Sequence, residues 1–290
     1  MKTKEKYKKN SEKYLNKKKS KKDDMYEAKK KYGQNFLEDT ELLTEILKAS
    51  NVSKESEVFE IGPGLGFLTG SLLKESKFLT AFEIDDDLIP VLEKKFGNTE
   101  NFLLVHEDFM TVDLKKYVEG KKDIKVVANI PYYITSPIIN RLIEFRENIS
   151  EIYLMVQKEV AERIAAKPRS RNMSLLTHAV QFYGEAQYMF TVNKEKFTPV
   201  PKVDSAFVKI EIFKDRRYER QISEEEYFKY LKAAFSAKRK SLGNNLTELG
   251  YSKSFIVEIL EKRGKGALAR AEEFSLQEFI DLIKYLKEAD

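Results

Sequence analysis

Two short segments of the sequence combine residue types that could bind a cofactor and an amine. The first is the glycine-rich run Glu60-Ile61-Gly62-Pro63-Gly64-Leu65-Gly66, and the second, Asn129-Ile130-Pro131-Tyr132, begins 63 residues after Gly66. Glycines let a nucleotide-like ligand lie close against the backbone. The Asn129 side-chain oxygen and the Pro131 carbonyl can accept both hydrogens of an amino group. Together the segments predict methyl transfer from S-adenosylmethionine (SAM) to an exocyclic amine of a base.

The spacing of the glycines distinguishes between cofactor classes. Gly62, Gly64 and Gly66 follow an apolar run and precede a helical pattern, which is the context that a glycine motif requires. A dinucleotide-binding loop would carry its third glycine at position 67, where this chain has Phe67. The G-x-G-x-G form therefore favours a SAM-binding methyltransferase, and the alternative is a plain turn between strand and helix.

Acidic residues after the next two apolar runs extend the predicted cofactor site. Glu83 ends one run, and we expect its carboxylate to accept hydrogen bonds from both ribose hydroxyls, with Ile84 beside it in the same site. Asp108 follows the next run and is placed to accept a hydrogen bond from the adenine amine. Phe109 would supply a flanking apolar surface. The alternative for each acid is a surface residue that only aids solubility.

The Asn-Ile-Pro-Tyr segment is the predicted catalytic element. An aromatic amine is a poor nucleophile because its lone pair is delocalised, and two acceptors, the Asn129 amide oxygen and the Pro131 carbonyl, would tip that lone pair toward the methyl donor without a strong base. Pro131 restricts the loop, and Tyr132 is expected to stack on the extruded base. Phe197 is a candidate second stacking face; the alternative is that it packs in the core.

Alternating strand and helix patterns would position these segments. We expect strands at Val58–Ile61, Phe78–Ile84, Phe102–Val105, Ile124–Ala128 and Ile152–Val156. We expect helices at Asp39–Ala49, Leu65–Leu73, Leu88–Phe96, Leu114–Val118 and Ile138–Phe145. This order predicts an α/β, Rossmann-like, mostly parallel sheet covered on both faces, as in class I SAM-dependent methyltransferases. Ligands bind such sheets at the carboxyl ends of the strands.

The pattern changes after about residue 180. Two adjacent antiparallel strands are expected at Gln187–Val192 and Ser205–Ile212, followed by helices at about 223–247, 252–262 and 275–288. The charged stretch Phe213–Gln221 is the expected linker. We therefore predict a lysine-rich, disordered extension over residues 1–30, a SAM-binding catalytic domain over 31–214 and a helical RNA-recognition domain over 215–290.

Composition limits the functional classes. The 290 residues include no cysteine and two isolated histidines, so we expect no disulfide and no metal site. The sequence contains no apolar run of about 18 residues, so we expect no membrane span. The N-terminus also lacks the apolar stretch of a signal peptide. We therefore predict a cytoplasmic protein with no membrane partner.

The net charge of +5 conceals a basic N-terminal tail. Residues 1–31 contain 14 lysines and five acidic residues, a balance of +9, so the remaining 259 residues carry −4. Such a tail could attract RNA through its phosphates. The alternative is a solvated extension that aids solubility.

These motifs resemble those of the ribosomal RNA adenine N6,N6-dimethyltransferases of the bacterial KsgA type, over roughly residues 31–288. The matching segments are Gly33-Gln34-Asn35-Phe36-Leu37, Glu60 to Gly66, Asn129 to Thr135, Gln157 to Arg163, Phe197 to Ala206 and Arg270-Ala271-Glu272. The resemblance implies that Gln34, Asn35 and Leu37 help to close the cofactor pocket. It also implies cofactor contacts for Gly62, Glu83, Asp108 and Asn129.

The family's activity implies SAM-dependent dimethylation of two adjacent adenosines near the 3′ end of small-subunit (16S) rRNA. The substrate would be an immature small ribosomal subunit, and the enzyme a monomer. Basic residues outside the tail are candidates for an RNA-binding surface. The alternative is that they only make helix faces soluble. They are Arg163, Lys167, Arg169, Arg171, Lys238, Arg239 and Lys240. Gly243 departs from the polar or basic residue expected after this second group.

Two alternative functions share parts of this signature. One is a methyltransferase that modifies an adenine of large-subunit rRNA and confers macrolide resistance. The Arg270-Ala271-Glu272 and Gln157–Arg163 segments favour the small-subunit enzyme over it. The other is a non-catalytic assembly factor with the same fold, against which the intact Asn129–Tyr132 segment argues.

Overall fold

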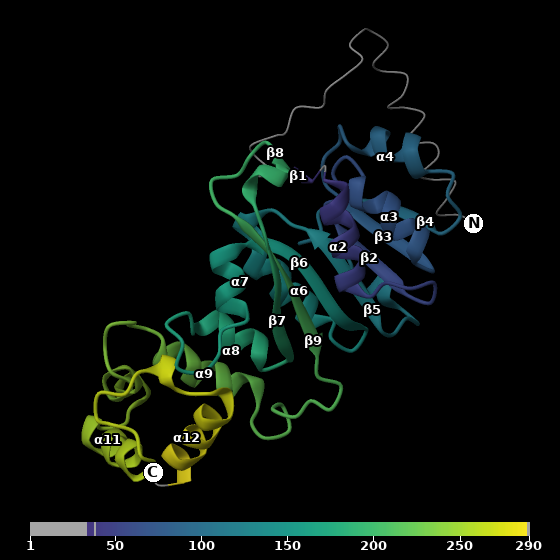
Figure 1. The fold of residues 1–290 in the computed structure, drawn as a ribbon. Coiled ribbons are helices and arrows are strands. Elements are labelled where there is room, and N and C mark those ends of the chain that lie inside the picture. The colour runs from purple at the N-terminus through teal and green to yellow at the C-terminus, as the bar shows by residue number, and fades with distance from the viewer. Residues whose placement is uncertain (1–33, 38, 289–290) are drawn as a thin grey trace. The chain divides into compact units, whose positions relative to one another are not determined.

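The computed structural model describes residues 34–37 and 39–288, so the predicted extension over residues 1–30 lies outside the described residues (Figure 1). The chain divides into two compact units. The first comprises the residues up to Thr135 together with Asn193–Lys202, and the second comprises Ser136–Val192 and the residues from Val203 onward. This division does not fall at the predicted boundary near residue 214, so the proposed functional domains stay a prediction.

The first unit contains four parallel strands in the order β4-β3-β2-β5. Their bounds are β2 Glu57–Ile61, β3 Phe78–Glu83, β4 Phe102–His106 and β5 Ile124–Asn129. Strands β2 and β3 are buried along nearly their whole length, as continuous apolar runs in a parallel sheet should be. The connecting helices are α3 Phe67–Glu75, α4 Ile89–Phe96 and α5 Lys115–Val118. The predicted βα alternation is confirmed.

The chain before the sheet contains one predicted and one unpredicted element. Helix α2 spans Thr40–Ser50, and the Asp39 carboxylate caps it by accepting a hydrogen bond from the Leu42 N–H at 2.8 Å. The unpredicted element is the two-residue strand β1, Phe36–Leu37, which pairs antiparallel with β8, Phe197–Thr198. This pairing fixes a segment near the N-terminus beside one that follows it by about 160 residues.

In the second unit three antiparallel strands follow the order β6-β9-β7. Their bounds are β6 Ile149–Gln157, β7 Gly184–Val192 and β9 Ser205–Ile212. The predicted antiparallel pair β7 and β9 is confirmed. Among the described residues these seven longer strands belong to one mostly parallel sheet of the Rossmann-like class, as predicted.

Helices make up the rest of the second unit. They are α7 Lys158–Ile164, α8 Leu175–Gln181, α9 Glu224–Ala234, α10 Leu242–Asn245, α11 Lys253–Lys262 and α12 Leu276–Glu288, while α6 Thr135–Glu144 begins at the boundary. The sequence did not predict α7 and α8. The helices predicted at 252–262 and 275–288 correspond to α11 and α12, and their bounds agree to within about one residue. None of the helices in the described ranges is long and apolar enough to cross a membrane.

The expected helix over residues 223–247 is wrong, because the chain leaves the helix after Ala234. The buried Asn245 amide donates hydrogen bonds to the Ala234 carbonyl at 2.7 Å and to the Ala237 carbonyl at 3.1 Å. These bonds satisfy carbonyls that a continuing helix would have used. Residues 236–241 therefore form an irregular segment, and the helix resumes only as the short α10.

The expected linker Phe213–Gln221 does not separate the two compact units. The Arg146 guanidinium donates to the Glu219 carboxylate at 2.7 Å and also bonds Glu224. Its central carbon lies 5.0 Å from the centre of the Tyr183 ring. Because this half-buried network joins residues on both sides of position 214, the charged stretch is part of the second unit's structure.

Candidate cofactor and amine-binding site

The glycine turn connects β2 to α3 as predicted, and its glycines serve different purposes. Gly62 and Gly66 have φ of +67° and +80°, in the left-handed region that favours glycine. A Cβ added at Gly66 would lie 2.5 Å from Cε2 of Phe96, so that glycine is required for packing. A Cβ added at Gly62 would meet nothing within 4 Å. The space beside Gly62 therefore fits a cofactor lying against the backbone.

Glu83 ties this turn to the end of β3. Its Oε2 accepts a hydrogen bond from the Gly64 N–H at 3.1 Å, and its Oε1 accepts from the N–H groups of Ile84 and Asp85, each at 2.9 Å. Burial raises the pKa of the Glu83 carboxyl, while these bonds favour its ionised form. Each carboxylate oxygen can accept more than one hydrogen bond, so the predicted bonds to ribose hydroxyls are compatible with this arrangement.

Glu60 is a feature of the site to which sequence reasoning gave no role. It is buried in β2 directly before the glycine turn, and its Oε2 has no hydrogen-bond partner among the described residues. Burial, with a contribution from the charge of Glu83, raises the pKa of Glu60 to about 8. The available signal was an acidic residue inside an otherwise apolar strand.

The predicted adenine-binding residues lie at the carboxyl ends of β3 and β4. These ends are adjacent, because Glu83 pairs with His106 in the register of the two strands. Asp108 follows β4, and its Oδ1 accepts a hydrogen bond from the Met110 N–H at 2.9 Å. The Phe109 ring is buried, with its centre 5.3 Å from that of Phe82. Ile84, which is 41% exposed, offers the more accessible apolar surface.

Asn129 ends β5 with its amide in a defined orientation. The Asn129 Nδ2 donates a hydrogen bond to the Asn35 carbonyl at 2.9 Å. Because the nitrogen is held by a carbonyl, the other atom of the amide, Oδ1, is an acceptor and points away from that bond. An acceptor at the carboxyl end of β5 is what the predicted amine-binding role requires.

Pro131 and Tyr132 lead from β5 into a short 3-10 turn, Tyr132–Ile134. The Pro131 carbonyl already accepts a hydrogen bond from the Ile134 N–H, at the long distance of 3.3 Å. A carbonyl has two lone pairs, so one acceptor position is left for an amine hydrogen. The Tyr132 carbonyl accepts from the Thr135 hydroxyl at 3.1 Å, which fixes the turn that presents the half-buried Tyr132 side chain.

The segment that the resemblance placed over the cofactor pocket is anchored on both sides of it. Gln34 Nε2 donates to Asp85 Oδ2 at 3.1 Å, beyond β3, and the Asn35 carbonyl binds Asn129, at the end of β5. Leu37 is buried and pairs with Phe197. Phe197 itself is 1% exposed, so its ring presents no open face to a base in this arrangement. A stacking role for Phe197 would require β8 to shift.

The basic residues predicted to contact RNA are all exposed, and all lie in the second unit. They form two groups, residues 163–171 and 238–240. The Arg169 N–H donates to the Glu272 carbonyl at 3.1 Å, and the Leu242 N–H, just after the second group, donates to the Ala269 carbonyl at 2.7 Å. Both groups therefore adjoin one segment, residues 269–272. The described residues contain no cluster of acidic or histidine side chains that could bind a metal ion.

The fold and site together define a SAM-dependent methyltransferase. The glycine turn, the acids after the next two parallel strands and the oriented Asn129 occur in the order and at the sheet edge that this class requires. The family model for ribosomal RNA adenine dimethylases matches residues 25–288. The chain belongs to this family.

Individual relatives agree with the family match. The Ribosomal RNA small subunit methyltransferase A of Fusobacterium nucleatum subsp. nucleatum is 52% identical over 260 residues, covering 89% of this chain and 97% of the relative. The protein of the same name from Clostridium botulinum (strain Loch Maree / Type A3) is 40% identical over 256 residues, covering 88% and 93%.

Solved structures share the fold. A dimethyladenosine transferase from Plasmodium falciparum matches with a TM-score of 0.72 and 28% identity, covering 87% of this chain and 98% of that one. The 23S rRNA methyltransferase ErmE matches with a TM-score of 0.67 and 25% identity, covering 87% and 100%. The fold alone therefore does not identify the substrate, because one of these two structures is named for 23S rRNA and the other names no RNA.

Proposed function

We propose that this enzyme transfers methyl groups from SAM to N6 of two adjacent adenosines near the 3′ end of small-subunit (16S) rRNA. The amine-binding role is supported by the orientation of the Asn129 amide. Its nitrogen donates a hydrogen bond to the Asn35 carbonyl, so its oxygen is the atom that can accept a hydrogen bond from the adenine amine. The choice of rRNA is supported by relatives at 52% and 40% identity that are named as small-subunit methyltransferases. The match to the 23S enzyme is weaker, at 25% identity.

The residues act mainly by positioning. SAM, when bound, supplies an electrophilic methyl group on a sulfonium. Asn129 Oδ1 and the Pro131 carbonyl accept hydrogen bonds from the two N–H groups of adenine N6, which orients the nitrogen lone pair, and Tyr132 stacks on the base. As N6 becomes methylated its proton turns acidic and passes to water, so no strong base is needed. The second transfer begins with one N–H, which either acceptor can hold.

The cofactor-binding roles fall to the turn and the strand ends. Gly62 leaves space for the cofactor, Glu83 and Asp108 accept hydrogen bonds from its ribose and adenine, and Ile84 covers the adenine face. The Gln34–Leu37 segment closes the pocket. Support comes from the contacts that anchor Gln34, Asn35 and Glu83 around the turn.

The helical residues 215–290, together with Arg163 to Arg171, bind the rRNA of an immature small subunit, and the enzyme acts as a monomer in the cytoplasm. Support comes from the two exposed basic groups that adjoin residues 269–272. A surface of this kind attracts rRNA through its phosphates, independently of base sequence. The catalytic loop would then act on adenosines presented by the subunit.

The test is the choice of substrate by the purified full-length protein with radiolabelled SAM. We expect dimethylation of immature small subunits from a strain that lacks the modification, mapped to two adjacent adenosines by mass spectrometry. Small subunits from the modified parent strain are the matched control and should accept no label. Activity confined to protein-free large-subunit rRNA would refute the proposal.

A further inference from the structure

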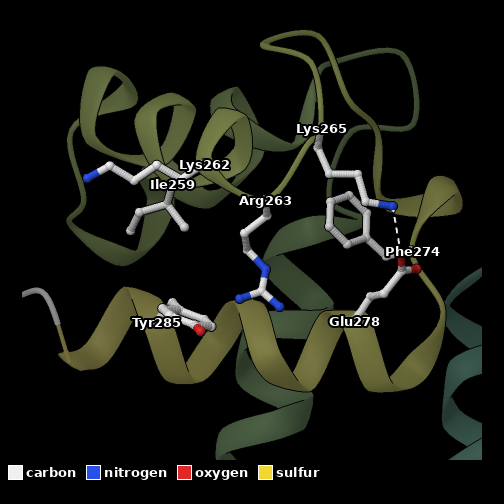
Figure 2. A pocket seen from close by; sticks show the side chains of 7 residues that line it. All are labelled: Ile259, Lys262, Arg263, Lys265, Phe274, Glu278 and Tyr285. Carbon is white, nitrogen blue, oxygen red and sulfur yellow. Dashed lines mark hydrogen bonds and ion pairs between the residues drawn. The ribbon is translucent and has the colours of Figure 1, made fainter.

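A hollow of about 360 Å³ lies within the helical part of the second unit. The end of α11 and the loop that follows it form one side, and α12 forms the other (Figure 2). Its walls combine three cationic side chains, two aromatic rings and a single carboxylate. No step of the methyl transfer described above uses these residues.

The aromatic part of the hollow contains one buried and one exposed ring. Phe274 is fully buried and forms a wall, with the Lys265 ammonium 4.6 Å from its centre. Tyr285 is 51% exposed on α12. The central carbon of the Arg263 guanidinium lies 4.2 Å from the centre of the Tyr285 ring. A guanidinium beside an exposed aromatic ring is a surface on which a nucleobase can stack.

The three cations differ in how firmly their acidic partners hold them. Lys265 is 13% exposed and lies 2.9 Å from Glu278, so this pair is a structural wall of the hollow. Lys262 is 71% exposed, and its bond to Glu258 is a surface pair of the kind that contributes little stability. Arg263 and Asp281 are 3.7 Å apart, longer than a normal hydrogen bond. Lys262 and Arg263 can therefore turn to a phosphate at small cost.

The loop that bounds the hollow also connects it to the basic surface. Residues 263–274 include the segment 269–272. The carbonyls of this segment accept hydrogen bonds from the main-chain N–H groups of Arg169, in the first basic group, and Leu242, just after the second. The loop that lines the hollow is therefore continuous in the chain with the segment that adjoins both basic groups. The residues lining the hollow carry three positive charges and one negative charge, and two further acids, Glu258 and Asp281, pair with Lys262 and Arg263 from outside the lining.

We infer that this hollow binds one unpaired nucleotide of the RNA substrate, with its base stacked on Tyr285 beside Arg263 and its phosphate held by Lys262 and Arg263. The volume lies at the small end of the range for ligand pockets, which suits one nucleotide. A free anion would not need the ring, and an apolar ligand would not need the cations. The inference rests on the proposed function, because it takes the RNA to be the substrate.

The experiment compares full-length Tyr285→Leu and Arg263→Gln with the wild type. Tyr285→Leu keeps an apolar side chain and removes the stacking face. Lys116→Gln is the matched control, because Lys116 is an exposed lysine of the first unit that pairs with Asp113 and belongs to neither the proposed cofactor site nor the proposed rRNA surface. Thermal unfolding confirms that each variant is folded. The measurements are kcat and KM for immature small subunits, the Kd for SAM, and ultraviolet cross-linking to RNA read by mass spectrometry.

We expect KM to rise at least about fivefold in both hollow variants, as the loss of one base-stacking contact implies. The value of kcat should stay within about twofold, and the Kd for SAM should not change. The Lys116→Gln control should match the wild type in each of these measurements. The wild type should give a nucleotide adduct on Tyr285. Folded variants with an unchanged KM and no adduct would overturn the inference.

The result also separates this inference from the proposed function. If the wild type methylates small subunits and the hollow variants behave identically, only the hollow is wrongly assigned. If the wild type modifies another RNA, the proposed substrate is wrong, while the adduct on Tyr285 still tests the hollow. A loss of binding to small subunits without any loss for protein-free rRNA would indicate a protein partner and overturn the inference.

Discussion

Alanine substitutions in the glycine turn should separate cofactor binding from packing. Gly62→Ala and Gly66→Ala both place a Cβ on a left-handed backbone, which costs about 1–2 kcal/mol of unfolding free energy. At Gly66 the new Cβ also lies 2.5 Å from the Phe96 ring, which is itself packed 5.8 Å from the Phe102 ring. Overpacking of this kind adds about 1–3 kcal/mol. Gly66→Ala should therefore lose roughly 2–5 kcal/mol in total.

Gly62→Ala should instead act on SAM. Its Cβ meets no protein atom within 4 Å and would occupy the space assigned to the cofactor. We expect a Kd for SAM at least about tenfold weaker, equivalent to about 1.4 kcal/mol. Gly120→Ala is the matched control for backbone strain, because Gly120 has φ of +72°, equally open surroundings and no place in the site.

Urea unfolding and calorimetric titration with SAM measure the two effects separately. We expect Gly62→Ala and Gly120→Ala to lose similar stability, with only Gly62→Ala losing affinity. The reasoning would be refuted by an unchanged Kd in Gly62→Ala. It would equally be refuted if Gly66→Ala were no less stable than Gly120→Ala.

Three further predictions concern single residues. Asn129→Ala should lower methyl transfer at least about tenfold, or about 1.4 kcal/mol, with the Kd for SAM within a few-fold; unchanged turnover in a single-turnover assay would contradict the amine-binding role. The folded protein keeps the Glu60 proton up to about pH 8, whereas the unfolded chain releases it above about pH 4.5. The unfolding free energy should therefore decrease as the pH rises from about 4.5 to about 8. Glu60→Gln should remove that fall in denaturant titrations at several pH values, and a slope like that of the wild type would contradict it. Asn245→Ala removes two bonds to the carbonyls after α9 and should cost about 1–3 kcal/mol in urea unfolding; a loss below 0.5 kcal/mol would count against this account of the helix end.

The parts of the fold that were predictable have signals spread over many neighbouring residues. The parallel strands are continuous apolar runs with clear ends, and Asp39 is a capping residue directly before a periodic segment. The site residues at strand ends were predictable for a related reason, because their positions follow from the strands that precede them. Once the order of strands is known, Glu83 and Asp108 must lie at one edge of the sheet.

The parts that were missed depend on contacts between residues far apart in the chain. The β1 and β8 strands are two residues each, too short to show a period, and they exist through their mutual pairing. The helix end at Ala234 depends on Asn245. The charged stretch after residue 212 looks like a linker, yet Arg146 binds it into the second unit. The burial of Phe197 likewise follows from tertiary packing.

The two main-chain hydrogen bonds from Arg169 and Leu242 to residues 269–272 have a consequence for the salt dependence of binding. They hold the backbone at Arg169 and just after Lys240 through main-chain atoms, so these two contacts leave the basic side chains of both groups exposed. All seven of these side chains can thus displace counterions from the rRNA, and affinity should fall with the logarithm of salt concentration with a slope approaching about −6 on duplex regions. Removing one cation should lessen that slope by about one, while the remaining cations stay in place.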